Sequence, residues 1–154
     1  MKTFISYSTA ADQIIALRLQ TMAAVYGMTI YVPPATTREN RTGLLIPEVQ
    51  EQLRQSDVVL AVITHRPAPS ALSEMNSAVS LGKLLIPIVG PGVPADYYAN
   101  FRPYFVVDPN DPSQAEQQIV QFLAGQHQMQ VAGTAALLAL TTLVIALLLF
   151  GKSK

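Results

Sequence analysis

The chain has 154 residues, half of them hydrophobic, and its ten basic side chains balance ten acidic ones. This balance, with no block of like charge, leaves no electrostatic footprint for nucleic acid. The absence of cysteine excludes disulfide bonds, thiolate metal sites and cysteine nucleophiles. Two histidines far apart in the sequence argue against a structural zinc site.

Five short apolar runs are predicted to be β-strands. Several are apolar on successive residues, which is typical of parallel strands that helices cover on both faces. In chain order the runs are KTFISY (2–7), MTIYV (28–32), DVVLAVIT (57–64), LLIPIV (84–89) and YFVVD (104–108).

The segments between these runs carry apolar residues at helical spacing. Thr9 and Asp12 form a predicted capping box, and Gly27, Gly82 and Gly125 are predicted helix stops. Strand–helix alternation predicts an open, doubly wound α/β domain, in which ligands bind at the carboxyl ends of the strands. The predicted helices are 10–26, 44–55, 71–81 and 112–124, and the loops that follow strands are 8–10, 33–43, 65–70 and 90–97.

The run 131–150 contains no charged residue in 20 positions. A helix of about 20 residues spans the hydrocarbon core of a bilayer, so this run predicts one transmembrane helix in contact with lipid. The predicted organisation is therefore a domain over 1–124, a linker over 125–130, the helix over 131–150 and a tail over 151–154. Because the amino terminus lacks a signal peptide, we expect a single-pass membrane protein with a cytoplasmic domain, although the lysines of the tail favour the opposite orientation.

Several common α/β signatures do not occur. A GxGxxG turn after the first strand, a GxxxxGK[ST] loop and a GxSxG elbow are all missing, which leaves dinucleotide-fold, P-loop and α/β-hydrolase assignments without support. A phospho-receiver needs an aspartate at the end of the third strand, whereas Asp57 begins that run and Thr64 and His65 end it.

Four segments in order resemble the Toll/interleukin-1 receptor (TIR) domain family. They are FISYS (4–8) with Asp12, GMTIYV (27–32), the helix and third strand over 46–64, and SEMNSA (73–78) with LGKLLIPI (81–88). The resemblance covers residues 2–124 and implies a flavodoxin-like fold, with a five-stranded parallel sheet and flanking helices.

The resemblance also implies a reaction. TIR enzymes cleave NAD between nicotinamide and ribose, with a glutamate at the position of Glu74, so NAD is the expected substrate and no bound cofactor is needed. Loss of nicotinamide leaves an oxocarbenium-like ribose, which a carboxylate stabilises. The alternative for Glu74 is a first-turn carboxylate that complements the helix dipole, with Ser70 or Ser73 as cap.

Eight further residues are candidates for substrate binding: Ser6, Tyr7, Ser8, Arg38, Arg41, His65, Ser70 and Ser73. The arginines could hold a pyrophosphate bidentately, and the serines could bond ribose hydroxyls. Each has an ordinary alternative, namely core packing for Tyr7, solvation for the arginines and His65, and helix capping for Ser70 and Ser73.

Three functions remain open at this stage. The first is a TIR enzyme that consumes NAD, as an immune or defence effector or signal producer, and self-associates through the 33–43 loop. The second is a TIR adaptor without activity, favoured by the atypical loop sequence PPATTRENRTG and by Ser70 where the family often has tryptophan. The third resembles nucleoside deoxyribosyltransferases, in which a glutamate attacks a sugar.

Overall fold

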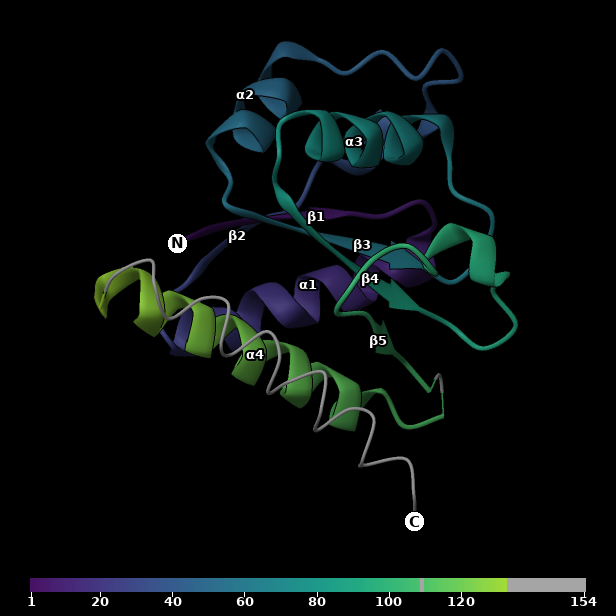
Figure 1. The fold of residues 1–154 in the computed structure, drawn as a ribbon. Helices are drawn as coiled ribbons and strands as arrows, with labels where there is room; N and C mark the ends of the chain where they lie inside the picture. The colour runs from purple at the N-terminus through teal and green to yellow at the C-terminus, as the bar shows by residue number, and fades with distance from the viewer. Residues whose placement is uncertain (109, 133–154) are drawn as a thin grey trace.

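The computed structural model describes residues 1–108 and 110–132 (Figure 1). The strands are β1 (Lys2–Ser6), β2 (Thr29–Tyr31), β3 (Val58–Ile63), β4 (Leu84–Val89) and β5 (Phe105–Val106). The helices are α1 (Ala10–Val25), α2 (Pro47–Gln55), α3 (Pro69–Ser80) and α4 (Pro112–Ala132), with short 3₁₀ helices η1 (Ala35–Glu39) and η2 (Ala95–Tyr97).

The five strands form one parallel sheet in the order β2-β1-β3-β4-β5. This is the flavodoxin-like order, whose ligand site lies where the chain switches direction, at the carboxyl ends of β1 and β3. The predicted flavodoxin-like fold, with a parallel five-stranded sheet and flanking helices, is confirmed. All five predicted strands occur: β4 has the predicted bounds, and the other four are shorter than predicted at one or both ends.

Helices cover both faces of the sheet (Figure 1). In β3, Val58, Leu60 and Val62 pack in the cluster that includes α1 and α4. The alternate residues of the same strand, Val59 and Ile63 among them, pack in the second cluster, with α2 and α3. Every residue of β3 is buried, which explains why its sequence shows no polar alternation.

The ends of α1 and α3 follow local sequence signals. Thr9 caps α1 by accepting a hydrogen bond from the backbone N–H of Asp12, but the Asp12 carboxylate does not complete the predicted box, because it accepts a hydrogen bond from Thr64 instead. Gly27 follows α1 with a φ of 72°, as a helix-ending glycine requires. Helix α3 begins at Pro69, two residues earlier than predicted, since proline suits the first helical position.

The carboxyl-terminal part corrects two predictions. Helix α4 does not end at Gly125 but runs on to Ala132, so the predicted linker 125–130 is helical. A glycine inside a helix costs only about 1 kcal/mol, and burial of Leu123 and Gln126 on either side of it offsets that cost. The ring Nδ1 of His127 also lies 3.2 Å from the amino group of Met1.

The predicted single-pass membrane localisation is also corrected. Over residues 1–108 and 110–132, the structure contains no helix that is both long enough and apolar enough to cross a bilayer. The predicted span 131–150 begins inside α4, and its residues from 133 onward, like the tail 151–154, lie outside the described residues.

Candidate functional site

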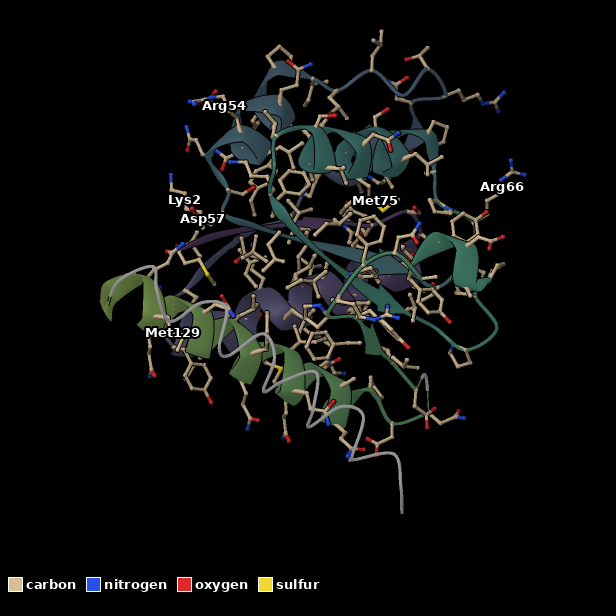
Figure 2. The ribbon with its side chains drawn as sticks, in the orientation of Figure 1. Lys2, Arg54, Asp57, Arg66, Met75 and Met129 are labelled. Atoms are coloured by element: carbon tan, nitrogen blue, oxygen red, sulfur yellow. The ribbon has the colours of Figure 1, made fainter. Side chains whose placement is uncertain are left out.

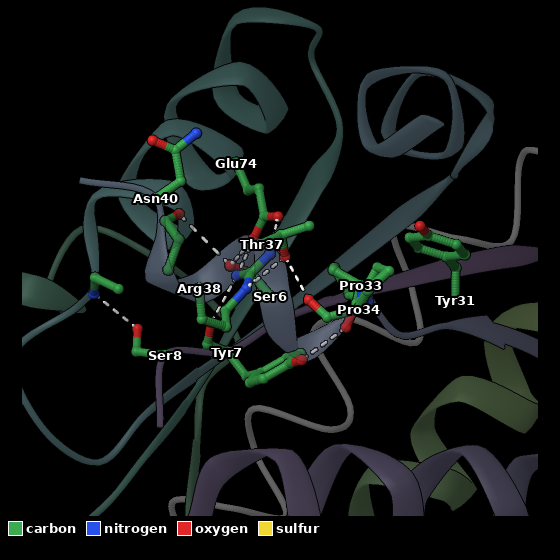
Figure 3. Close-up of polar contacts among 12 residues, drawn as sticks. Ser6, Tyr7, Ser8, Tyr31, Pro33, Pro34, Thr37, Arg38, Asn40 and Glu74 are labelled. Carbon is green, nitrogen blue, oxygen red and sulfur yellow. Dashed lines mark hydrogen bonds and ion pairs between the residues drawn. The ribbon is translucent and has the colours of Figure 1, made fainter. Parts of the chain in front are cut away.

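The candidate site lies at the carboxyl end of β1, under α3 and the segment that contains η1 (Figure 3). Glu74 is the sixth residue of α3 and has no exposed surface. It is therefore not a first-turn carboxylate, and the predicted alternative of a helix-dipole partner was wrong. The N-cap of α3 is Ala68, which has no side-chain cap, so neither Ser70 nor Ser73 caps the helix.

Both carboxylate oxygens of Glu74 are engaged. The Arg38 guanidinium donates from Nη1 to Oε1 at 2.7 Å and from Nη2 to Oε2 at 2.5 Å. The Ser6 hydroxyl donates to Oε1 at 2.7 Å. The Glu74 carboxylate thus accepts three hydrogen bonds and has no access to solvent. Figure 3 shows this arrangement, with Arg38 and Ser6 pointing toward Glu74 from different segments.

Further contacts hold Arg38 in place. Its Nη1 also donates to the backbone oxygen of Tyr7 at 2.6 Å, and its Nε donates to the Thr37 hydroxyl at 3.0 Å. The guanidinium carbon lies 4.8 Å from the centroid of the Tyr7 ring, within cation–π range. The Tyr7 hydroxyl in turn donates to the backbone oxygen of Pro33 at 2.7 Å. Both ends of the η1 segment are thereby tied to the end of β1.

Burial determines the electrostatics of the site. It raises the pKa of the Glu74 carboxyl from its ordinary value of 4.5, while the hydrogen bonds and charge of Arg38 and the hydrogen bond of Ser6 oppose the rise. Burial also raises the pKa of the Tyr7 hydroxyl, against the effect of Arg38. Burial and the nearby Glu48 raise the pKa of Tyr31 to about 12. Both tyrosines therefore stay neutral at physiological pH, and Arg38 is the neighbour that most opposes the rise in the Glu74 pKa.

A glycine allows the loop after η1 to approach α3. Gly43 has a φ of +71°, and a Cβ at this position would come within 2.9 Å of the Ser73 hydroxyl and 3.3 Å of the Pro69 backbone oxygen. Just before it, Asn40 accepts hydrogen bonds from the backbone N–H and the hydroxyl of Thr42. This local turn and the close approach place the 33–43 loop, and hence Arg38, against α3.

A cavity of about 170 Å³ lies between this loop, α2 and α3. Drug-sized ligands occupy pockets of about 300–1,000 Å³, whereas a cavity of about 150 Å³ binds benzene. The cavity therefore has room for one six-membered ring but not for a whole dinucleotide. Its lining comprises polar Thr36, Thr37, Arg38, Asn40, Ser70 and Glu74 and apolar Leu44, Leu45, Ile46 and Val49.

The other predicted residues have diverse positions. Ser8 accepts a hydrogen bond from the backbone N–H of Ala68 at 2.9 Å and so fixes the start of α3. Ser70 lines the cavity, and its buried hydroxyl has no hydrogen-bond partner among the described residues. Arg41 is exposed outside the cluster around Glu74. His65 is exposed as well, and its Nδ1 lies 2.9 Å from the Thr64 hydroxyl.

Sequence reasoning missed the apolar wall of the cavity and Thr37. Leu45 and Val49 both fall within the predicted helix 44–55, but α2 begins only at Pro47, so Leu45 precedes it. A usable signal was the Asn40-Arg41-Thr42-Gly43 sequence, since an asparagine side chain can bond the backbone two residues further on and glycine allows a positive φ.

Comparisons with known proteins give the fold but no family. No family model matches the chain, and no curated protein matches it. It resembles the solved structure of a Clostridium botulinum CMP N-glycosidase, with a TM-score of 0.51, 12% identity, and coverage of 80% of this chain and 98% of that one. It is also similar to a Klebsiella pneumoniae protein assigned as a quinone reductase, with a TM-score of 0.46, 13% identity, and coverage of 83% and 84%. Neither is described as a TIR domain, so the TIR resemblance stays a prediction.

Proposed function

We propose that the protein hydrolyses the N-glycosidic bond between the ribose and the base of a nucleotide, with Glu74 as the catalytic carboxylate. The observation that carries this proposal is the position of Glu74. It is a buried carboxylate that lines a ring-sized cavity at the carboxyl end of β1. In sheets of this order, that end is where ligands bind.

The chemistry requires one well-placed carboxylate. The bond between C1′ of the ribose and the base nitrogen breaks, and its electron pair leaves with the base. Water supplies a hydroxyl to C1′, and the proton left over goes to the departing base, or to the medium when the base leaves as neutral nicotinamide. Positive charge develops on the ribose as the bond breaks. Glu74 stabilises that charge when it is ionised, and it can protonate a neutral leaving base when it is protonated.

Two substrate classes follow from different observations. The four-segment TIR resemblance supports NAD, whose nicotinamide is a single six-membered ring. The cavity of about 170 Å³ also suits the single ring of a pyrimidine base, and a protein of similar fold is named as a CMP N-glycosidase. Both substrates have a one-ring base on a phosphorylated ribose, so they share the bond that breaks.

The structure describes the site in a closed state. Glu74 is fully buried and both of its oxygens are bonded, so C1′ of a substrate cannot reach it while Arg38 stays in place. Activity therefore requires the Arg38 side chain to leave the carboxylate. The attachments of the η1 segment through Tyr7 and Thr37 show which contacts must break or rearrange.

The same closure favours a second candidate, a TIR adaptor that binds other TIR domains without catalysis. In this case the ion pair is a structural tie that shapes the 33–43 loop. Leu44 and Ile46 are exposed at 73% and 41% beside that loop, where they could contact another copy. Changes in the loop would then abolish assembly, with no turnover to affect.

The test is product chromatography with the full chain at high protein concentration. NAD and CMP are offered separately, and released nicotinamide or cytosine is measured over time. We expect base release by the wild type and none by Glu74→Gln. Glu51→Gln, a change at an exposed glutamate of α2, is the matched control and should release base at the wild-type rate. If the wild type and Glu74→Gln leave both substrates intact, the enzymatic proposal fails and the adaptor candidate replaces it.

A further inference from the structure

Charges that line the cavity cancel in the closed state. Among the ten lining residues, Arg38 carries the one positive charge and Glu74 the one negative charge. The side chain of Arg38 is 6% exposed and that of Glu74 is 0% exposed, and they lie 2.5 Å apart. An anion that enters the cavity therefore meets no free cation. To bind there, it must compete with Glu74 for the guanidinium.

A phosphate group is a suitable competitor. The planar fork of an arginine binds carboxylate and phosphate in the same bidentate geometry. Arg38 also donates hydrogen bonds to the hydroxyl of Thr37, its neighbour in the 33–43 loop, and to the backbone oxygen of Tyr7. The guanidinium can thus leave Glu74 while its own segment remains next to the cavity.

Removal of Arg38 has a consequence for Glu74. An ionised carboxylate left buried without a partner is strongly unfavourable. Ser6 supplies one hydrogen bond, which does not replace the two from the guanidinium. Uptake of one proton by Glu74 removes the buried charge, so release of the guanidinium and protonation of the carboxyl favour each other.

We propose that Arg38 selects phosphorylated substrates by partner exchange, in which a ligand phosphate takes the guanidinium from Glu74 and Glu74 binds a proton. The exchange concerns anion binding and stands on the geometry of the pair. Its use in turnover rests on the proposed function. In that setting, with a pyrimidine nucleotide such as CMP, the protonated Glu74 delivers its proton to the departing base, and the carboxylate that remains stabilises the ribose cation. With NAD, nicotinamide leaves without a proton, so Glu74 must first give its proton to the medium before it can stabilise that cation. A ribosyl substrate without phosphate leaves the site closed.

The proton in this exchange can be assigned. The titratable groups that face Glu74 are Arg38, Tyr7 and Tyr31, and Glu48 in turn bonds Tyr31. Burial raises the pKa of both tyrosine hydroxyls, that of Tyr31 to about 12, so neither titrates near neutral pH. Burial raises the pKa of Glu74, and Arg38 provides the main opposition. Once Arg38 has left, Glu74 is the group in this cluster that takes up the proton.

Calorimetric titration of the full chain with sodium sulfate tests the exchange without any turnover. Sulfate has the tetrahedral shape of phosphate and does not titrate between pH 5 and 8. Measurement in two buffers of different ionisation enthalpy gives the number of protons bound with each sulfate. We expect about one proton per sulfate near neutral pH, and an affinity that falls about tenfold for each pH unit above the pKa of Glu74.

Three variants separate the exchange from a purely structural pair. Arg38→Met should lose sulfate binding. Glu74→Gln should bind sulfate more tightly than the wild type, without proton uptake, because no ion pair has to be broken. Arg54→Met, at the exposed pair, should match the wild type. Circular dichroism establishes that each variant is folded, and the proton count of the wild type decides the matter even if a variant is not.

The last arm compares CMP with cytidine. The wild type should bind CMP at least tenfold more tightly than cytidine, and this preference should vanish in Arg38→Met. The proposal is overturned if the wild type does not bind sulfate, binds it without proton uptake, or binds it as well after Arg38→Met. Sulfate binding with proton uptake but no base release would sink the proposed function and leave the exchange standing. Base release without proton uptake on sulfate binding would overturn the exchange and leave the proposed function standing.

Discussion

Two arginine–glutamate pairs of this protein have nearly the same geometry and opposite surroundings. Arg38 and Glu74 lie at the carboxyl ends of the strands, with side chains 6% and 0% exposed. Arg54 and Glu51 lie on α2, with side chains 64% and 48% exposed. Figure 2 shows Arg54 at the end of the sheet marked by Lys2 and Asp57, where ligands are not expected. In each pair the guanidinium donates two hydrogen bonds to the carboxylate.

The difference shows that geometry alone does not give an ion pair its role. An exposed ion pair contributes little to the free energy of unfolding, because water solvates each side chain well when its partner is absent. A buried pair is held by the high free energy of leaving one partner without the other. Accordingly, the hydrogen bond from Arg54 lowers the pKa of Glu51 to about 2, whereas burial raises the pKa of Glu74 in spite of Arg38.

The largest expected effect is the loss of one buried partner. Arg38→Met should lower the free energy of unfolding by about 3–5 kcal/mol, because it leaves Glu74 buried without a partner. Urea denaturation at neutral pH measures this change. Arg54→Met is the matched control and should leave the urea midpoint unchanged. Equal effects of the two substitutions would contradict the contrast between the pairs.

Removal of both buried partners should restore most of the stability. In Arg38→Met/Glu74→Met, apolar side chains replace the pair, and such replacements are often neutral or stabilising. The double-mutant cycle from urea midpoints should therefore show strong coupling between the two positions. If the losses in the free energy of unfolding from the two single substitutions simply add, the effect of Arg38→Met comes from the η1 segment and not from the unpaired charge of Glu74.

A smaller effect is expected from the glycine that seats the loop carrying Arg38. Gly43→Ala should lower the free energy of unfolding by about 1–2 kcal/mol from its positive φ alone, with a further loss because the new Cβ would meet Ser73 and Pro69. Gly82→Ala is the control, since Gly82 has a similar φ of +69° and open space around it. The difference between the thermal denaturation midpoints of the two variants measures the contribution of the close contact between Gly43 and α3. Equal midpoints would show that this contact contributes nothing.

The pH dependence should differ in sign between the two glutamates. The raised pKa of Glu74 lets the folded state keep a proton, so its contribution to stability is complete below pH 4.5 and is lost as the pH rises through the folded pKa. The pKa of Glu51 is lowered to about 2, so its contribution is present above pH 4.5 and is lost as the pH falls toward 2. Solvent screening makes the effect of Glu51 small.

Urea midpoints from pH 3 to 8 measure this contrast. Arg38→Met removes the main influence that lowers the Glu74 pKa, so the pKa of Glu74 rises further in this variant. The free energy of unfolding of Arg38→Met should therefore keep falling, as the pH is raised, to a higher pH than that of the wild type. In Arg54→Met, only the small loss at low pH should disappear. A wild-type pH profile that Arg38→Met leaves unchanged in shape would show that Arg38 does not control the ionisation of Glu74.

The sequence predicts the sheet well because its strands are encoded locally. The run of β3 is apolar at every position and could not be an exposed strand, and Gly27 predicts the end of α1 from its freedom at positive φ. The position of Glu74 in a helix after β3 also follows from the sequence. The end of α4 does not, because tertiary packing of Leu123 and Gln126 overrides the helix-stop tendency of Gly125.

The partner of Glu74 was beyond sequence reasoning. Arg38 is 36 positions away in the chain, and it reaches Glu74 through a 3₁₀ helix that the sequence did not predict. The pair Arg54–Glu51, three positions apart on one helix, could be read from spacing alone. Local pairs follow from helical periodicity, whereas pairs that build a site depend on how a loop folds back.

One measurement tests the central claim most directly, namely that Glu74 is a site carboxylate released from Arg38 by a phosphorylated ligand. The side-chain carboxyl carbons of glutamate are labelled with ¹³C in the full chain, and the Glu74 signal is assigned by its loss in Glu74→Gln. The account predicts that CMP or NAD moves this signal toward the protonated form, that cytidine does not, and that the Glu51 signal stays in place. A Glu74 signal that remains that of an ionised, unperturbed carboxylate at the highest soluble concentration of either nucleotide would contradict it.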